Sequence, residues 1–293
     1  MASLAVLTAR PDLAIYRELE AAGPGAGHEV AVIDALSAVA SAGPPAVLAG
    51  GKWLDLAAFA AVLPRVGNWR PDSVLAVLET MAAAGVSALN PAAAIRCGRD
   101  HWATVAALAA AGLPYPATVA GADPQSLAAA ATEHCGLPCV VKQRASRQGV
   151  GVIRCTTRDH LEGVLESLWR LGEEVVVQRF CPPGGWSRRV LVLEGALLGA
   201  TEHEAAGGEF RSNAARGASV REVVLSAEQV DLALAAAQII GLGFCGVDLF
   251  PDGEHWVVGE VNPSPGWRHF GSATGTNVAA RLVAALARCG GVG

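Results

Sequence analysis

The first ninety residues alternate between short apolar runs and segments with helical spacing, and this alternation constrains the fold most. Strands are predicted over residues 4–7, 29–33, 60–63 and 86–89, and helices over residues 12–22 and 71–85. Strands that alternate with helices favour a parallel sheet. A stretch rich in Gly, Pro and Ala, residues 41–51, is predicted to be a loop. Residues 1–89 are therefore expected to form an α/β domain.

From Asn90 onwards the chain changes character. Helices are predicted over residues 100–111, 123–135, 159–171, 229–241 and 277–288. Strands are predicted over residues 139–143, 150–155, 174–179, 189–193 and 197–201. No internal repeat interrupts this order, and the change at Asn90 suggests a domain boundary.

Two strand-like segments near the C-terminus carry acidic and amide side chains. The first is Gly246–Phe250, and Glu260 follows Asp248 by twelve residues. A turn signal, Pro251-Asp252-Gly253, lies between the two segments and predicts a hairpin. Asp248, Glu260 and Asn262 can then converge, since residues two apart in a strand share a face. Such oxygen ligands suit Mg²⁺ bound together with nucleotide phosphates, and the alternative is a hairpin with solvated acids.

A lysine lies within an otherwise apolar strand and precedes a loop that contains glycine. Lys142 follows two valines, and Ser146, Gly149 and Gly151 lie in or after the loop. The backbone N–H groups of such a loop can bind phosphate oxygens. The alternative is a lysine that reaches solvent from an edge strand.

A second polar loop holds Arg211 and Asn213, which would point the same way in an extended segment. A guanidinium and an amide so placed can hold a transferring phosphoryl group or an oxyanion. A polar surface loop is the alternative. The sequence contains no G-x-S-x-G elbow and no H-E-x-x-H motif, so neither of these catalytic arrangements is expected.

Composition narrows the class of partners. The net charge is −5, which gives no reason to expect a nucleic acid. Seven cysteines without a C-x-x-C pair predict buried free thiols in a reducing cytoplasm rather than disulfides or zinc. We expect no signal peptide, because no basic segment precedes an apolar stretch, and no membrane span, because Gly112, Pro114 and Pro116 break the longest uncharged run.

Taken in order, these motifs resemble those of the ATP-grasp superfamily and, within it, the RimK-type α-L-glutamate ligases. The resemblance runs from about Pro64 to the C-terminus, and before Pro64 it is one of pattern only. Its parts are Asn90-Pro91, Ala94-Ile95, Arg99-Asp100, Gly112–Thr118, Val140–Lys142, Gln148–Gly151, Val177-Gln178, Glu209–Asn213, Arg216-Gly217, Gly246–Asp248 and Glu260–Gly266.

The resemblance implies a fold of mixed α/β and α+β type. An N-terminal α/β domain of the pre-ATP-grasp kind would span residues 1–89. Two α+β subdomains would clasp ATP, a central one over residues 90–177 and a C-terminal one with the metal site over residues 178–293. A homo-oligomer is implied by analogy alone.

The resemblance also implies residue roles. Arg211 and Asn213 would be catalytic and would bind the acyl phosphate, and Asp248, Glu260 and Asn262 would hold one or two Mg²⁺, with Mn²⁺ as a substitute. The residues implied to bind ATP are Lys142, Gln148, Gly149, Gly151, Gln178, Arg179, Phe180, Ser187, Arg189, Arg211 and Ser212.

The implied reaction joins a carboxylate to an amine. The carboxylate attacks the γ-phosphorus of ATP to give an acyl phosphate and ADP, and the amine of an amino acid, usually glutamate, then displaces phosphate. The expected acceptor is a small-molecule carboxylate such as a pterin-type, tetrahydromethanopterin-like coenzyme. Two alternatives stay open: modification of a protein C-terminus, as in ribosomal-protein glutamylation, and a non-catalytic ATP-binding regulator.

Four positions depart from the family pattern. His101 replaces a usual Lys, Arg179 a common Glu, Ser187 an Asp, and His203 a frequent Arg. The loss of Lys at position 101 removes a permanent positive charge, because His is largely neutral at pH 7. We therefore expect these departures to affect nucleotide affinity rather than metal binding.

Overall fold

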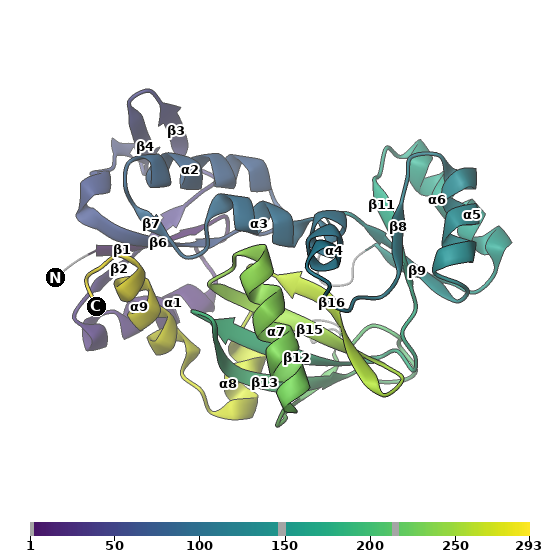
Figure 1. Ribbon diagram of the computed structural model, residues 1–293. Coiled ribbons are helices and arrows are strands. Elements are labelled where there is room, and N and C mark those ends of the chain that lie inside the picture. Colours follow the sequence, from purple (N-terminus) through teal and green to yellow (C-terminus); the bar gives the residue numbers. More distant parts are fainter. Residues whose placement is uncertain (1–2, 146–150, 213–216) are drawn as a thin grey trace.

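The structure is a computed structural model that describes residues 3–145, 151–212 and 217–293. Three parts follow one another across the molecule in Figure 1: the N-terminal α/β part, a five-stranded sheet in green, and a smaller teal part at the far end. The predicted residues Gln148, Gly149 and Asn213 lie outside the described ranges.

The N-terminal part contains the expected parallel sheet, with strand order β2-β1-β6-β7. Its strands are β1 (Ser3–Thr8), β2 (Glu29–Asp34), β6 (Phe59–Arg65) and β7 (Ser87–Ala88). Leu4 and Val6 share a core with α1 (Ala14–Ala22), whereas Ala5 and Leu7 share one with α2 (Pro71–Ala83). Helices thus cover both faces, which explains why the strands read as continuous apolar runs.

The prediction of a loop over residues 41–51 is wrong. The segment contributes to a three-stranded antiparallel sheet of β3 (Val39–Ala42), β4 (Pro45–Ala49) and β5 (Lys52–Trp53). Except for Pro45, which begins β4, its Gly and Pro residues lie in the connections, where Gly50 and Gly51 adopt positive φ values of 58° and 75°. Two such glycines form a tight hairpin turn, and Val47 of β4 is fully buried in a core that it shares with α2. Two short 3₁₀ helices, η1 (Pro24–Ala26) and η2 (Leu56–Ala58), complete this part.

The teal part is an antiparallel sheet of order β10-β9-β11-β8, covered on one face by two helices. Cys139, Val141 and Val177 face the helices, so their neighbours Val140, Lys142 and Gln178 face the other way, since strand side chains alternate. The elements are β8 (Thr118–Ala120), α5 (Pro124–His134), β9 (Cys139–Gln143), β10 (Val152–Cys155), α6 (Arg158–Arg170) and β11 (Val175–Arg179).

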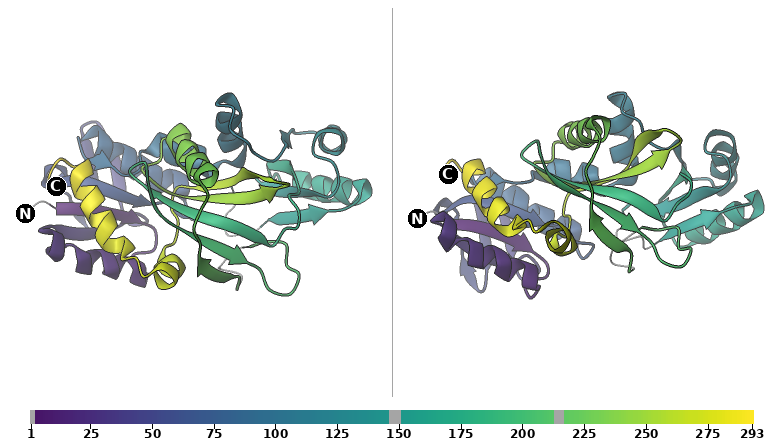
Figure 2. Two further views of the ribbon diagram at one scale, coloured as in Figure 1. Left: turned by 60° about the horizontal axis from the view of Figure 1, so that its bottom comes forward. Right: turned by 90° about the horizontal axis from the view of Figure 1, so that it is seen from below.

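The largest sheet is antiparallel, with order β14-β13-β12-β15-β16. Figure 2 shows α7 (Ala227–Ile240) lying across one of its faces. A capping box of Ser226 and Gln229 starts this helix. The strands are β12 (Trp186–Leu193), β13 (Ala196–Glu204), β14 (Ser219–Glu222), β15 (Phe244–Asp252) and β16 (His255–Asn262).

The hairpin predicted near the C-terminus is confirmed, since β15 and β16 pair antiparallel. Pro251 and Asp252 belong to the strand rather than to the turn, because they pair with Trp256 and His255. The remaining helices are α3 (Ala92–Arg99) and α4 (His101–Ala110), which lead from the N-terminal part, α8 (Arg268–Thr274) and α9 (Val278–Cys289).

The last helix returns to the first sheet and lies beside β1 in Figure 1. Leu282, Val283 and Leu286 of α9 share a core with Leu4 and Val6. α9 therefore contributes to the layer over the N-terminal sheet. The domain boundaries at residues 89/90 and 177/178 stay a prediction. In the ranges that the structure describes, no helix combines the length and apolar character needed to cross a membrane.

Candidate active site

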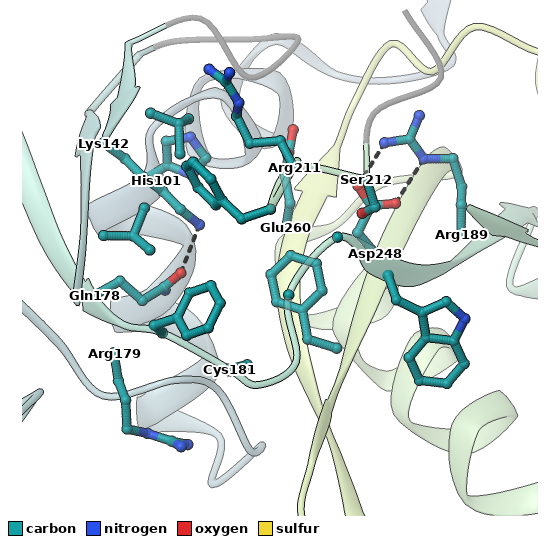
Figure 3. A pocket seen from close by; sticks show the side chains of 18 residues that line it. His101, Lys142, Gln178, Arg179, Cys181, Arg189, Arg211, Ser212, Asp248 and Glu260 are labelled. Atoms are coloured by element: carbon teal, nitrogen blue, oxygen red, sulfur yellow. Dashed lines mark hydrogen bonds and ion pairs between the residues drawn. The ribbon is translucent and has the colours of Figure 1, made fainter. Parts of the chain in front are cut away.

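A cavity lies between the antiparallel β10-β9-β11-β8 sheet and the five-stranded sheet (Figure 3). Nine of the predicted site residues line it: Lys142, Gln178, Arg179, Phe180, Arg189, Arg211, Ser212, Asp248 and Glu260. Gly151, Ser187 and Asn262 are described but are not among the lining residues. The structure shows that the first nine residues line one cavity, whereas the roles of all twelve stay predictions.

The end of the hairpin brings the predicted metal ligands to one face. Asp248 pairs directly with Glu260, and Gly246 pairs with Asn262. Directly opposite residues have Cβ atoms about 5 Å apart and point the same way. The Asn262 side-chain oxygen accepts a hydrogen bond of 2.9 Å from the Ser264 N–H. A register shift follows immediately after Asp248, so Gly259 is left out of the pairing and the ladder continues with Leu249 opposite Val258.

Arg189 on β12 faces the same cavity and binds Asp248 through two hydrogen bonds. Its Nε and Nη2 donate to the two carboxylate oxygens over 2.7 and 2.6 Å (Figure 3). Burial alone would lower the pKa of Arg189, but the charge and hydrogen bonds of Asp248, with Glu260, raise it. The guanidinium is therefore a permanent cation at the floor of the cavity.

The donor set at the hairpin end fits a hard divalent cation. Asp248 and Glu260 supply carboxylate oxygens and Asn262 an amide oxygen. The oxygens of Asp248 retain acceptor capacity beyond the bonds from Arg189, because a carboxylate offers about four lone-pair sites. No cluster of three His, Cys, Asp or Glu side chains suited to a metal occurs in residues 3–145, 151–212 and 217–293. A cation here would therefore need Asn262 and ligand oxygens as well as the two acids.

Lys142 points into the cavity from the opposite wall, where its ammonium donates to the Gln178 side-chain oxygen over 2.6 Å (Figure 3). Its ammonium lies 5.9 Å from the centre of the Phe250 ring. Desolvation lowers the pKa of Lys142, and the nearby Glu260 and Asp248 partly oppose that effect. A bound polyanion would stabilise the charged form of this lysine.

Arg179 follows Gln178 and also lines the cavity, and in Figure 3 its guanidinium extends away from Lys142. It binds both carboxylate oxygens of Asp252 over 2.8 and 2.6 Å. Arg179 is the last residue of β11, in the β10-β9-β11-β8 sheet, and Asp252 is the last residue of β15, in the five-stranded sheet. The ion pair therefore connects the two walls of the cavity at this edge.

Two of the four departures from the family pattern lie directly opposite each other. Ser187 on β12 pairs with His203 on β13, and both are buried. The Ser187 hydroxyl is 2.6 Å from the Ser212 hydroxyl, and a hydrogen bond links His203 to the Ser212 backbone. Burial, followed by repulsion from Arg189, lowers the pKa of His203 to about 4. A neutral pair therefore holds the chain next to Arg211.

Several lining residues were not predicted, among them Trp186, Phe210 and Phe250. A further one, Gly185, belongs to a Pro-Pro-Gly-Gly turn signal at residues 182–185 that could have indicated a built loop. The Gly185 N–H donates to the Phe210 carbonyl over 2.7 Å, and a Cβ at this position would lie 2.5 Å from the Glu209 carbonyl oxygen. Glycine is required there because the two loops touch.

The Arg211 side chain is bound by its own loop, with Nε and Nη2 donating to the Glu209 carboxylate over 2.9 and 2.6 Å. His101 lines the cavity at the start of α4, and its backbone N–H donates to the Arg144 carbonyl over 2.9 Å. Asp100 caps this helix and also binds Arg144. The helix is thus fixed to the wall that carries Lys142.

Two sheets that enclose a cavity lined with cations, next to paired acids, form the ATP-grasp arrangement of an ADP-forming ligase. Comparison with known families places the chain more closely. Residues 2–95 match the RimK PreATP-grasp domain and residues 98–286 the RimK-like ATP-grasp domain. The chain belongs to the RimK-like ATP-grasp family, which confirms the fold and enzyme class expected from the motifs.

Individual relatives agree with this assignment. A probable alpha-L-glutamate ligase of Thioalkalivibrio sulfidiphilus is 35% identical over 96% of this chain and 93% of its own. The crystal structure of the RimK domain protein ATP-grasp from Sphaerobacter thermophilus has a TM-score of 0.73 and 26% identity, covering 97% of this chain and 99% of its own. The ATP-grasp ligase PsnB, complexed with minimal precursor, Mg and ADP, has a TM-score of 0.73 and 21% identity over 99% and 98%. ATP-grasp ligases use ATP with Mg.

Proposed function

We propose that this enzyme adds L-glutamate, or a similar amino acid, to a carboxylate acceptor through an acyl phosphate. The observation that carries the proposal is the convergence of Lys142, Arg189 and Arg211 with Asp248 and Glu260 on one cavity. Three cations suit a transferring phosphoryl group, and the acids suit the cation that accompanies it. The name of the 35% identical relative supports glutamate as the amine substrate.

In the first step, an acceptor carboxylate oxygen attacks the γ-phosphorus, and the bond to the bridging oxygen of ADP breaks. Lys142 would bind phosphate oxygens from one wall, and Arg189 and Arg211 would do so from the other. Asp248, Glu260 and Asn262 would hold one or two Mg²⁺, or Mn²⁺ as a substitute, and the bound cation would neutralise phosphate charge. Gln178 would fix Lys142 through the observed hydrogen bond.

In the second step, the amine nitrogen attacks the acyl carbon, an amide bond forms, and phosphate leaves with the former carboxylate oxygen. Arg211 and Asn213 would stabilise the developing oxyanion. No side chain needs to form a covalent bond, since the binding groups position the reactants and neutralise charge. The predicted Gln148, Gly149 and Gly151 would provide backbone donors for the phosphates.

For the acceptor we propose a small-molecule carboxylate such as a pterin-type coenzyme. The chain's net charge of −5 supports a small acceptor over a polyanionic particle. A peptide acceptor is the second candidate, supported by the precursor peptide in the PsnB complexes. A cytoplasmic location and a homo-oligomer complete the proposal, and the unpaired state of all seven cysteines supports the former.

The test is a matrix of carboxylic acids and peptides against amino acids, with ATP and Mg²⁺, followed by ADP release. Mass spectrometry of the product identifies the acid that gains a glutamyl residue. Hydroxylamine in place of the amino acid should trap the acyl phosphate as a hydroxamate. Asp248→Asn should abolish ADP release while the far-UV circular dichroism spectrum is unchanged. Turnover retained in that folded variant would refute the metal assignment.

A further inference from the structure

The loop that follows Asn262 is held by side chains from the N-terminal part of the chain. Its sequence, Asn262–Gly266, contains two prolines, which have no N–H to donate. Three consecutive carbonyls in this loop, those of Pro263, Ser264 and Pro265, accept hydrogen bonds from residues about 170 to 200 positions away in the chain. The loop is therefore shaped from outside its own sheet.

Asn90 binds the open end of the hairpin. Its amide nitrogen donates to the Phe244 carbonyl over 2.7 Å and to the Pro263 carbonyl over 3.2 Å, and its oxygen accepts the Phe244 N–H over 2.8 Å. Phe244 is the first residue of β15, and Pro263 follows the last residue of β16. With 1% of its surface exposed, Asn90 joins the two strands that carry Asp248 and Asn262.

Arg65, the last residue of β6, binds the next two carbonyls of the loop. Its Nη2 donates to Pro265 over 2.6 Å and to Ser264 over 3.4 Å. The guanidinium carbon lies 4.9 Å from the centre of the Trp267 ring and 6.0 Å from that of Phe244. Arg65 is 8% exposed, and its Nε and Nη1 have no hydrogen-bond partner among the described residues.

A buried arginine that leaves two donor atoms unpaired is costly, so its position needs a compensating interaction. The two carbonyls and the two aromatic rings provide that interaction. Lysine at position 65 could not reproduce it, since a single ammonium lacks the planar fork and the stacking surface of a guanidinium.

We propose that Arg65 and Asn90 are positioning residues for the cation site, and that the N-terminal part thereby sets the geometry of Asn262. They act through the carbonyls of residues 263–265, which fix the backbone on which Asn262 is placed. The inference rests on the proposed role of Asn262 as a cation ligand. Residues that orient a metal ligand typically change metal affinity by roughly 10–100-fold when they are replaced.

The experiment measures Mn²⁺ binding directly. The electron paramagnetic resonance signal of free Mn²⁺ is titrated against full-length protein with ADP, and ADP alone is subtracted. The variants are Arg65→Lys, Asn90→Ala and Asn262→Ala. Arg99→Met is the matched control, because Arg99 donates to two backbone carbonyls, those of Val66 and Gly67, outside the loop. Thermal unfolding confirms that each variant is folded.

We expect Asn262→Ala, Arg65→Lys and Asn90→Ala each to weaken Mn²⁺ binding by at least tenfold, and Arg99→Met to leave it within twofold of the wild type. If Asn262→Ala weakens binding while the other two variants match Arg99→Met, the positioning role is refuted and the metal assignment stands. If Asn262→Ala binds Mn²⁺ as the wild type does, both are refuted. Two variants at different positions keep the test valid if one of them does not fold.

Discussion

His203 makes the stability of the protein depend on pH, because its pKa is lowered in the folded chain. The residue is 4% exposed, its Nε2 lies 3.0 Å from the Thr201 hydroxyl, and its pKa is lowered from 6.5 to about 4. Burial is the main cause, and the positive charge of Arg189 adds to it, whereas Asp248 and the Ser212 backbone partly oppose the change. The folded protein therefore holds this imidazole neutral.

The sign of the effect follows from proton binding. Between pH 6.5 and about 4, the unfolded chain binds a proton at His203 and the folded chain does not. The free energy of unfolding must then fall as the pH falls through this window, and the loss levels off below about pH 4. The lowered pKa corresponds to roughly 3 kcal/mol in total, of which roughly 2 kcal/mol is lost by pH 5.

The assay is urea unfolding followed by circular dichroism at several pH values from 7.5 to about 5, on the wild type and on His203→Gln. Glutamine keeps a neutral hydrogen-bonding side chain but takes up no proton. Three carboxyl groups, those of Glu202, Asp100 and Asp252, also have lowered pKa values. Their contribution to stability is lost mainly below the ordinary pKa values of 4.5 for Glu and 3.8 for Asp. The wild type should therefore lose roughly 2 kcal/mol more than the variant between pH 7.5 and 5. Parallel curves for the two proteins would refute the buried, neutral state of His203.

Three further outcomes are expected. The ion pair of Arg179 and Asp252 should have a coupling free energy of about 1 kcal/mol at most, because both side chains are about one-third exposed. A double-mutant cycle of Arg179→Ala and Asp252→Asn at two salt concentrations measures it. Lys142→Met should remove most ATP affinity, which titration calorimetry tests against Gln178→Leu, a milder change that keeps the ammonium but removes its hydrogen bond and the bond from Gln178 to Thr118. Chelation by EDTA should stop ADP formation, and excess Mg²⁺ should restore it; activity that persists in EDTA would contradict the proposed cation site.

The ligand hairpin could be predicted from the sequence because its information is local. Period two places Glu260 and Asn262 on one face of their strand, and the pairing of the short hairpin brings Asp248 opposite Glu260. Arg189 was expected to contact the nucleotide, but its bond to Asp248 could not be predicted. That bond depends on the register of β12 against β15, strands that are far apart in the chain. Register between such strands is set by tertiary packing, which a single sequence does not display.

The same reasoning explains the other misses. The loop expected over residues 41–51 forms strands because Val47 is buried beneath α2, and this contact outweighs the weak strand propensity of its Ala and Gly neighbours. The hydrogen bonds from Arg65 and Asn90 to the carbonyls of residues 263–265 also join segments that are far apart in the chain. In each case the sequence predicts the local pattern, whereas tertiary packing decides which distant segment it contacts.

Ser187, His203 and Arg179, which are expected to depart from the family pattern, have partners in the structure, and this favours retained chemistry over loss of activity. Ser187 and His203 face each other across β12 and β13, and the lowered pKa of His203 keeps this buried pair neutral. Arg179 has a carboxylate partner in Asp252. An unpaired charge buried in the cavity would cost stability, and none of these three replacements leaves one. The paired replacements instead keep Arg189 and Asp248 in a fixed arrangement, which is what a phosphoryl-transfer site requires.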